Sequence, residues 1–446
     1  MRQIISRRSL LLLVLDLIAM TVALQLSGYW RNYDSLKEIA GLSPSLFCVY
    51  FSYPFFFYVF DLYYPFKYFR PGKTLVDISI ACIVSAIFLS AAWFLNRSLA
   101  LPRPFFLIFN LFIIPGLLIV RSLYDVFFQS RMTDKKTLII GTGDLALNIA
   151  EIIQKTPHSG MELLGFVSEE KNKSKEGLPL KVLGDITQLV SLVDWHHIEL
   201  AILAVDVKGK ISEPELVFAL LQQKVQVTSA IHLFERMDEA IPYDCVNEHF
   251  ILGLMSEVRG LRYLHIKRIL DFLTAGALLL VFSPVMLFAY IFLFFQGPKD
   301  VFFMQDRVGV GGKKFRLIKF RTMTHTDSSG RQRVTWVGKW LRKFRIDETP
   351  QLINVLKGDM SVIGPRPEID YFVERCRKTI PYYDAVFSVR PGITGWAQVK
   401  FLHTTEMKDY PRKFCFNLYY LKNISLQLDL LIILKTIRIV LIGGGK

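Results

Sequence analysis

Cysteine is scarce in this chain of 446 residues: the five present are Cys48, Cys82, Cys245, Cys376 and Cys415, and they lie far apart. No two of them have the spacing of a zinc site, and nothing in their distribution indicates a disulfide framework. The sequence therefore predicts reduced cysteines that pack in the interior. It excludes a small domain held together by zinc or disulfides.

Acidic residues are also few, since 39 Asp and Glu stand against 54 Lys and Arg, a net charge of +15. The excess lies entirely in residues 262–446, which carry 30 basic and 14 acidic side chains. A basic domain attracts nucleic acid, anionic lipid and phosphorylated substrates alike. Hydrophobic residues make up 52% of the chain and its mean hydropathy is +0.34, which favours membrane lipid and phosphate over nucleic acid.

Long apolar runs are present near the N-terminus. Residues 10–26 follow a basic segment and lack the small-residue cleavage site of a signal peptide, so we expect a retained transmembrane helix. Three further runs are long enough, or nearly so, to cross a hydrocarbon layer of ~30 Å: 46–60, 75–95 and 105–120. The sequence predicts a four-helix transmembrane bundle over residues 1–130.

Basic residues in the short loops predict the orientation of this bundle. They precede the first run, separate the second from the third, and follow the fourth: Arg2, Arg7 and Arg8; Lys67, Arg70 and Lys73; Arg121, Arg131, Lys135 and Lys136. By the positive-inside rule both ends of the bundle are cytoplasmic. Asp16 and Asp77 lie within or near the runs, where an acidic side chain either joins helices or has a function.

Residues 131–230 change to a pattern of short strands and amphipathic helices. A strand at 137–140 runs into Gly141-Thr142-Gly143 and a helix, and further strands are expected at 163–167, 182–183, 200–205 and 225–227. This order predicts a Rossmann-like parallel α/β domain. Ala146 replaces the third glycine of the fingerprint, so Gly141 and Gly143 either hold a nucleotide or only form the turn. Residues 231–261 are a connector.

A fifth apolar run, 272–295, is interrupted by Ser283-Pro284. A full span here would carry the basic domain, residues 262–446, to the outer face of the membrane. Proline kinks a helix, and a serine beside it can satisfy a freed carbonyl. We therefore expect a re-entrant hairpin over residues 269–296 that enters and leaves on the cytoplasmic face; a kinked full span is the alternative.

Paired carboxylates, Asp347 and Glu348, precede a short predicted helix with Thr349 as N-cap and Gly358 as terminator. The helix N-terminus favours anions and keeps Asp347 ionised. An ionised carboxylate can attack phosphorus while its neighbour binds a divalent cation such as Mg²⁺. The alternative is a solvated surface pair with nearby arginines.

Several cations accompany these carboxylates. Lys319 and Arg321 share one face of a predicted strand, which suits a diphosphate or is simply a solvated face. Arg366 stands between two prolines and is pre-oriented to bind phosphate oxygens, with Glu368 either orienting it or binding a sugar or base edge. Arg390 opens a second basic turn.

Trp396 follows that turn, and it either stacks on a base such as uracil or anchors at the membrane interface. The sequence does not separate these two roles.

Together these residues resemble the bacterial sugar transferases, the polyprenyl-phosphate phosphoglycosyl transferases in their larger form. The matching stretches are Lys267-Arg268 with Asp271, Ser283-Pro284, and residues 305–309, 319–323, 347–351, 354–361, 364–368 and 391–398. The resemblance implies a membrane α bundle, a Rossmann-like domain, and an α/β catalytic domain with a re-entrant membrane hairpin.

It further implies an enzyme of the bacterial inner membrane, with its catalytic domain on the cytoplasmic face. Such an enzyme transfers a sugar phosphate from a UDP-sugar to undecaprenyl phosphate and releases UMP, with Mg²⁺ assistance. Asp347 matches the nucleophile, which forms a covalent phosphosugar, and Glu348 matches its partner. Relatives of this form begin exopolysaccharide or O-antigen repeat units. The sequence leaves the sugar open, and a homo-oligomer remains one option for the assembly.

Two positions depart from the family pattern. Asn417 stands where an aspartate is common, which removes a charge beside the substrate or metal, and Thr349 stands where leucine is usual.

Other functions remain to be weighed. The spacing of Tyr263 and Lys267 is similar to that of an NAD-dependent epimerase or dehydratase, but both residues adjoin the apolar hairpin. No Asp-x-Asp motif supports a metal-dependent glycosyltransferase. A non-catalytic scaffold is the remaining alternative, although Asp347, Glu348 and Arg366 argue against it.

Overall fold

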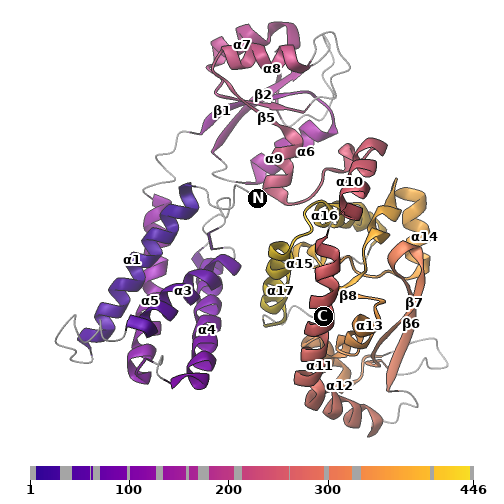
Figure 1. The fold of residues 1–446 in the computed structure, drawn as a ribbon. Helices are drawn as coiled ribbons and strands as arrows, with labels where there is room; N and C mark the ends of the chain where they lie inside the picture. The colour runs from indigo at the N-terminus through magenta and orange to yellow at the C-terminus, as the bar shows by residue number, and fades with distance from the viewer. Residues whose placement is uncertain are drawn as a thin grey trace. The chain divides into compact units, whose positions relative to one another are not determined.

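The computed structural model describes residues 7–30, 43–60, 62–63, 71–97, 101–126, 134–156, 160–168, 180–204, 213–260, 262–295, 301–323, 333–401 and 406–441 (Figure 1). These residues belong to two compact units, 1–230 and 231–446. Each unit is described by itself.

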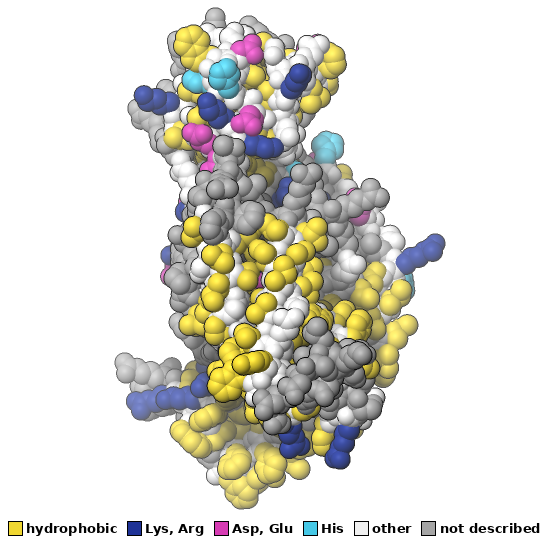
Figure 2. Space-filling view, turned by 90° about the vertical axis from the view of Figure 1, so that its left-hand side faces the viewer, with side chains coloured by type: hydrophobic (Ala, Val, Ile, Leu, Met, Phe, Trp, Pro, Cys, Tyr) yellow, Lys and Arg dark blue, Asp and Glu magenta, His cyan; other side chains and the backbone are white. Residues whose placement is uncertain are grey.

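The first unit begins with a bundle of four apolar helices, α1 (Arg7–Tyr29), α3 (Ser43–Val59), α4 (Pro71–Leu95) and α5 (Arg103–Tyr124). Helices α1, α4 and α5 are long and apolar enough to cross a membrane, while α3 has 17 residues and contains Pro54. Hydrophobic side chains cover much of the described bundle surface (Figure 2). The four helices expected from the sequence are confirmed.

One ion pair lies inside this bundle. Arg121 on α5 donates to both carboxylate oxygens of Asp16 on α1, at 2.7 and 2.8 Å, and both side chains are buried. The Tyr63 ring lies 5.8 Å from the Arg121 guanidinium carbon. Asp16 therefore joins two helices, because a buried intramembrane carboxylate requires a partner of this kind.

The second part of this unit is a parallel five-stranded sheet in the order β3-β2-β1-β4-β5 (Figure 1). The strands are β1 (Lys135–Ile140), β2 (Met161–Ser168), β3 (Val182–Asp185), β4 (Leu200–Leu203) and β5 (Gln226–Ser229), and the helices are α6 (Asp144–Lys155), α7 (Leu189–His196) and α8 (Glu213–Gln222). Apolar residues of β1, β4, α7 and α8 form a single core cluster. This order is the doubly wound arrangement, so the Rossmann-like prediction is confirmed.

The second unit begins with α9 (Ala230–Asp238), α10 (Glu248–Gly260) and the 33-residue helix α11 (Tyr263–Phe295). An antiparallel hairpin follows, β6 (Phe302–Val308) and β7 (Lys314–Phe320), and then α12 (Trp336–Lys343) and α13 (Gln351–Lys357). Strands β8 (Ser361–Ile363) and β9 (Gly392–Thr394) pair in parallel. The remaining helices are α14 (Asp370–Thr379), α15 (Trp396–Lys400), α16 (Tyr410–Lys422) and α17 (Leu426–Leu441).

Helix α11 continues through Pro284 as one helical element, and Ser283 Oγ donates to Leu280 O at 2.7 Å. Its two halves pack in different places. Ala275 clusters with Leu317 of β7, whereas Ala289 and Leu293 cluster with Phe320. Positions 317 and 320 point to opposite faces of a strand, so the two halves of α11 belong to core clusters on opposite faces of β7.

Polar side chains attach the first half of α11 to three other elements. Lys267 forms a buried ion pair with Asp429 of α17. Arg268 donates to Val355 O and Leu356 O at 2.6 and 2.9 Å, and thereby caps the end of α13. Asp271 Oδ1 accepts from the Val362 N–H of β8 at 3.0 Å.

Tyr263 donates to the same Asp429 carboxylate at 2.8 Å. Tyr263 and Lys267 are therefore structural partners of α17, and their spacing does not mark a dehydrogenase pair.

Candidate active site

The two carboxylates lie in a single 3-10 turn, Ile346–Glu348, which connects α12 to α13. Arg345 opens the turn in the left-handed region, with φ 54°. Thr349 already has helical backbone angles and its hydroxyl donates to Ile346 O at 2.8 Å, so the expected N-cap role of Thr349 is wrong. The reason is that the turn runs directly into α13, and the helical backbone begins before Thr349. Gly358 ends α13 with φ 96°, as expected.

Glu348 is held by two arginines. Its Oε1 accepts from Arg366 Nη2 at 3.0 Å, and its Oε2 lies 3.5 Å from Arg345 Nη1. Burial alone would raise the pKa of Glu348, but the attraction of Arg366 and Arg345 outweighs it, so its pKa lies below the usual range. Glu348 is therefore a fixed anion, and 14% of its side chain remains exposed.

Asp347 behaves differently from its neighbour. Burial, and then the negative charge of Glu348, raise the pKa of Asp347 to about 6, against the opposing attraction of Lys319 and Arg342. A carboxyl group with a perturbed pKa beside a charged partner is typical of a functional site. Asp347 is ionised near neutral pH, yet its charge is less well stabilised than that of Glu348.

Lys319 lies on β7 and interacts electrostatically with both carboxylates. Burial, and then the nearby Arg307, lower its pKa. Its ammonium group lies 5.0 Å from the centre of the Phe303 ring, the residue opposite it on β6. Arg321 comes just after β7, and its backbone N–H donates to Val301 O at 2.8 Å.

Asn354 ties the strand that carries Lys319 to the helix that follows the carboxylates. Its Nδ2 donates to Arg316 O at 2.8 Å, and its Oδ1 accepts from the Ile318 N–H at 3.1 Å. The buried side-chain amide thus replaces a neighbouring strand along β7. Asn354 lies in a stretch that matches the family, residues 354–361. Its bridging role depends on long-range contacts, which the spacing of residues in the sequence does not show.

The turn that carries Arg366 is braced by β6. Arg307 Nη1 donates to Pro367 O at 3.1 Å, and the Val308 N–H donates to Glu368 O at 3.0 Å. Burial lowers the pKa of Arg307 despite the attraction of Glu368. Sequence reasoning did not single out Arg307, although it lies in a stretch that matches the family.

The side chain of Glu368 is buried and forms an ion pair with Lys413 of α16. The Tyr410 hydroxyl lies 3.5 Å from Glu368 Oε2. Because its carboxylate already has partners in the interior, Glu368 is poorly placed to bind a sugar or base edge, and its role in orienting Arg366 stays a prediction.

Arg390 lies apart from the carboxylates. Its Nε donates to Gly358 O at 3.0 Å, at the far end of α13, a helix of seven residues and therefore about 10 Å long. Arg390 also lines a cavity of about 150 Å³ with Lys267, Asp271 and Ser361. Arg390 thus lies in a cavity away from Asp347 and Glu348. Its role toward a substrate stays a prediction.

Trp396 is 1% exposed, its ring stacks on Tyr419 with centres 5.8 Å apart, and its indole N–H donates to Glu239 O at 2.9 Å. Both roles expected for Trp396, the base platform and the membrane anchor, are therefore wrong. The indole is a core residue because its only polar atom has an internal partner. Asn417 is likewise buried, on α16.

No group of three or more potential metal ligands from His, Cys, Asp and Glu occurs among the described residues. Mg²⁺ commonly takes one or two carboxylates and completes its shell with water and substrate phosphate, so the pair Asp347 and Glu348 fits it. Asp347 is the better candidate ligand, because the two arginines already engage the Glu348 oxygens.

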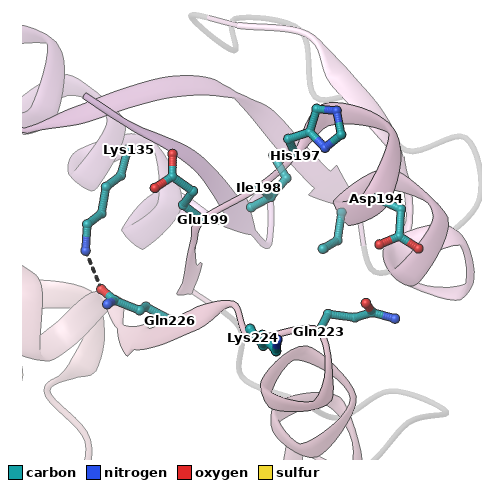
Figure 3. Close-up of a pocket in the computed structure, with 9 residues that line it drawn as sticks. Lys135, Asp194, His197, Ile198, Glu199, Gln223, Lys224 and Gln226 are labelled. Carbon is teal, nitrogen blue, oxygen red and sulfur yellow. Dashed lines mark hydrogen bonds between the residues drawn. The ribbon is translucent and has the colours of Figure 1, made fainter. Parts of the chain in front are cut away.

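In the α/β domain, Gly141 has φ 119°, a backbone conformation that favours glycine, and Gly143 precedes α6 as its N-cap. A hollow of about 370 Å³ lies at the opposite end of the strands from the glycine turn, where β1, β4 and β5 begin (Figure 3). Lys135, Glu199 and Gln226 line it, and Lys135 Nζ donates to Gln226 Oε1 at 2.6 Å. This hollow is not at the glycine turn, so nucleotide binding by Gly141 and Gly143 stays a prediction.

Fold and site define a membrane protein whose basic α/β domain surrounds two carboxylates with cations. The family model for the bacterial sugar transferases matches residues 262–443, and that for a CoA-binding domain matches residues 59–227. A UDP-glucose:undecaprenyl-phosphate glucose-1-phosphate transferase of Caulobacter vibrioides is 39% identical over 185 residues, 38% of this chain and 68% of the relative. The chain belongs to the bacterial sugar transferase family.

Two other relatives extend this comparison. A UDP-N-acetylgalactosamine-undecaprenyl-phosphate N-acetylgalactosaminephosphotransferase of Aeromonas hydrophila is 47% identical over 191 residues; the match covers 41% of this chain and less than half, 45%, of that relative. A UDP-glucose:undecaprenyl-phosphate glucose-1-phosphate transferase of Escherichia coli strain K12 is 28% identical over 326 residues, 68% of this chain and 67% of the relative.

Proposed function

We propose that this protein transfers a sugar 1-phosphate from a UDP-sugar to undecaprenyl phosphate and releases UMP, and so begins a repeat unit of exopolysaccharide or O-antigen. The observation that carries the proposal is the contrast within the pair: Glu348 is a fixed anion, while Asp347 has a pKa of about 6. The names of the relatives support the same substrates.

In the first step a carboxylate oxygen of Asp347 attacks the β-phosphorus of the UDP-sugar. The bond from that phosphorus to the bridging oxygen breaks, its electron pair leaves with UMP, and an acyl phosphate joins Asp347 to the sugar phosphate. Poor stabilisation of the Asp347 charge favours this attack, because the charge is relieved when the new bond forms.

In the second step a phosphate oxygen of undecaprenyl phosphate attacks the same phosphorus. The bond to Asp347 breaks, the carboxylate is regenerated, and undecaprenyl diphospho-sugar is formed. Each step brings two anions together, so nearby cations lower the barrier by offsetting their repulsion. Lys319 and Arg366 are the residues placed for this role, since both interact electrostatically with Asp347 and Glu348.

The Asp347 carboxylate would hold Mg²⁺, and the ion would supply positive charge that offsets the repulsion between the anions at the site. Glu348 then has a different task. Its bond to Arg366 holds that guanidinium toward the site.

A membrane-surface location on the cytoplasmic face accords with these substrates. Helix α11 would measure about 50 Å if straight, well beyond a hydrocarbon layer of ~30 Å. The two halves of α11 belong to core clusters on opposite faces of β7, which supports a bend near Ser283-Pro284 and hence the re-entrant form. Large apolar side chains remain exposed beyond the proline, among them Val285, Leu287, Phe288, Ile291, Phe292 and Phe295.

The test is UMP release by the purified full-length protein with undecaprenyl phosphate and Mg²⁺, using UDP-glucose, UDP-galactose and UDP-N-acetylgalactosamine as donors. Asp347→Asn should abolish release. The matched control is Asp384→Asn, which alters an exposed carboxylate that pairs with Arg377 outside the matching stretches and should leave release unchanged. Full activity of a clean Asp347→Asn preparation would exclude the proposed nucleophile.

A further inference from the structure

Helix α9 and the residue that follows it carry three acidic side chains, Glu235, Asp238 and Glu239, which we call the acidic clamp. The clamp lies between the two stretches that match family models, since the first ends at residue 227 and the second begins at residue 262. Each of its carboxylates nevertheless pairs with a cation on α15 or α16. The carboxylates are only 15–23% exposed, so these pairs are better shielded from water than ion pairs on an open surface.

The acidic clamp holds α16 at both ends. Arg412 Nη2 lies 2.7 and 2.6 Å from the two carboxylate oxygens of Asp238, and the Arg412 guanidinium carbon lies 5.9 Å from the centre of the buried Phe234 ring. Lys422, the last residue of α16, donates to Glu235 Oε1 at 2.6 Å. Residues 412 and 422 lie about 15 Å apart along a helix, so the two pairs fix the direction of α16 as well as its position.

The same clamp holds α15. The Glu239 carboxylate pairs with Lys400, the last residue of α15, and Glu239 O accepts from the indole N–H of Trp396, its first residue, at 2.9 Å. Glu239 has φ 56°, a left-handed conformation that is uncommon for a residue with a side chain. Such a conformation persists where surrounding contacts impose it, and here both contacts are with α15.

Helix α15 begins against the turn 364–368, which carries Arg366. The Gly364 N–H donates to Thr394 O at 2.9 Å. Gly395, the N-cap of α15, lies so close to this turn that a Cβ on it would meet Gly364 O at 2.1 Å. A shift of α15 would therefore displace the backbone before Arg366.

Helix α16 holds the same turn on its other side. Lys413 forms the buried ion pair with Glu368, two residues after Arg366. Lys413 is also the neighbour of Arg412, and successive residues of a helix point about 100° apart, so Arg412 faces Asp238 while Lys413 faces the turn. A shift of α16 would therefore displace the backbone after Arg366.

We propose that the acidic clamp positions Arg366. By holding α15 and α16 it fixes the turn 364–368 on both sides, and with it the guanidinium that bonds Glu348. Glu235, Asp238 and Glu239 act through Arg366 and are positioning residues. The effect on catalysis rests on the proposed function, whereas the effect on the turn does not.

Hydrogen exchange of the full-length protein in detergent, followed by mass spectrometry, tests the positioning without any activity. Asp238→Lys places a like charge opposite Arg412, so we expect amide exchange over residues 361–368 to become about tenfold faster. Exchange over α13, residues 351–357, should stay unchanged, which a general loss of stability would not allow. Arg412→Glu in the same chain reverses the ion pair and should restore most of the protection.

Two further variants complete this measurement. Asp238→Asn is the milder change if Asp238→Lys does not fold, and it should speed up exchange over the same residues to a smaller extent. Glu151→Lys is the matched control, because it reverses one charge of an exposed ion pair with Lys155 on α6 and should leave this exchange unchanged. Unchanged exchange over residues 361–368 in the folded Asp238 variants overturns the proposal, whatever their activity.

Kinetics then show whether the clamp acts through Arg366. Asp238→Lys should lower kcat for UMP release about tenfold, but less than about threefold when Arg366→Lys is already present, because the residue being positioned has then been altered. Equal factors in the two backgrounds overturn the proposal. Failure of the unaltered protein to release UMP from any donor would contradict the proposed function alone, and the exchange measurement still decides the clamp.

Discussion

Arg366 Nη2 donates to Glu348 Oε1 at 3.0 Å, although the two residues belong to different turns and lie 18 positions apart in the sequence. Through this bond Glu348 holds Arg366, the arginine that we expect to bind phosphate, in position. Arg366→Lys should therefore lower kcat/KM for the UDP-sugar by about 10²-fold, because an ammonium cannot fork onto two oxygens. Initial rates of UMP release measure this effect.

Exposed arginines elsewhere in the same unit provide the control. Arg375→Lys, on α14, should leave the rate unchanged, since the Arg375 guanidinium is exposed and donates to Tyr371 of its own helix. Equal rates for Arg366→Lys and the unaltered protein would contradict the role given to Arg366.

Arg307 is a positioning residue for the same turn, through its bond to Pro367 O. Arg307→Lys should lower kcat by about 10²-fold, the cost of a misplacement of roughly 1 Å, with a smaller change in thermal stability. The measurement is kcat and KM together with the melting temperature. A purely structural role would lower the melting temperature and leave kcat per folded molecule intact.

The raised pKa of Asp347 predicts that kcat depends on pH. Its folded-state pKa of about 6 means that the attacking carboxylate becomes protonated as pH falls through 6, so kcat should fall tenfold per pH unit below that value. A pH profile between 4.5 and 8 of single-turnover UMP release measures it. A profile flat to pH 5 would show that bound substrate or metal keeps Asp347 ionised.

The raised pKa of Asp347 also affects the stability of the fold. Because the folded-state pKa of Asp347 is raised above its unfolded value of 3.8, the ionised carboxylate destabilises the fold above pH 6, and this cost is lost as pH falls through 6 toward 3.8. Asp347→Asn should therefore raise the melting temperature at pH 7.5 and have little effect near pH 4. A lower melting temperature at pH 7.5 would contradict the sign.

Removal of the Asn354 side chain should lower the free energy of unfolding of the catalytic unit. Asn354→Leu leaves the Ile318 N–H and the Arg316 carbonyl without their partner, a loss of about 2 kcal/mol or more of unfolding free energy. Chemical denaturation in detergent measures it. Asn423→Leu is the matched control: its exposed amide bonds only its own helix, so the expected change is within about 0.5 kcal/mol.

Local sequence patterns predict much of the secondary structure of this protein. The four apolar runs, the order of strands after Lys136, and the glycine that ends α13 are all confirmed, because hydrophobic period and special backbone angles act within a few residues. The carboxylate pair and Arg366 were also recognisable, since their residue types and spacing already imply phosphate chemistry.

Other features depended on long-range contacts. The sequence predicts an N-cap at Thr349, whereas its hydroxyl donates within the preceding 3-10 turn. It also predicts a ligand-binding or membrane-anchoring role for Trp396, whereas the indole N–H donates to Glu239 O across 157 positions of sequence. The roles of Arg307 and Asn354 were missed for the same reason. A hydrogen bond between distant segments has no periodic signature in sequence.

The sequence by itself determined the apolar segments, the α/β pattern and which residues could do chemistry, because propensity and burial pattern are local properties. Only the tertiary structure decided what those residues do: that Glu348 holds Arg366, that Glu368 pairs with Lys413, and that Asp347 has a pKa near 6. Burial and the arrangement of neighbouring charges set these properties, and both arise only when distant segments pack together.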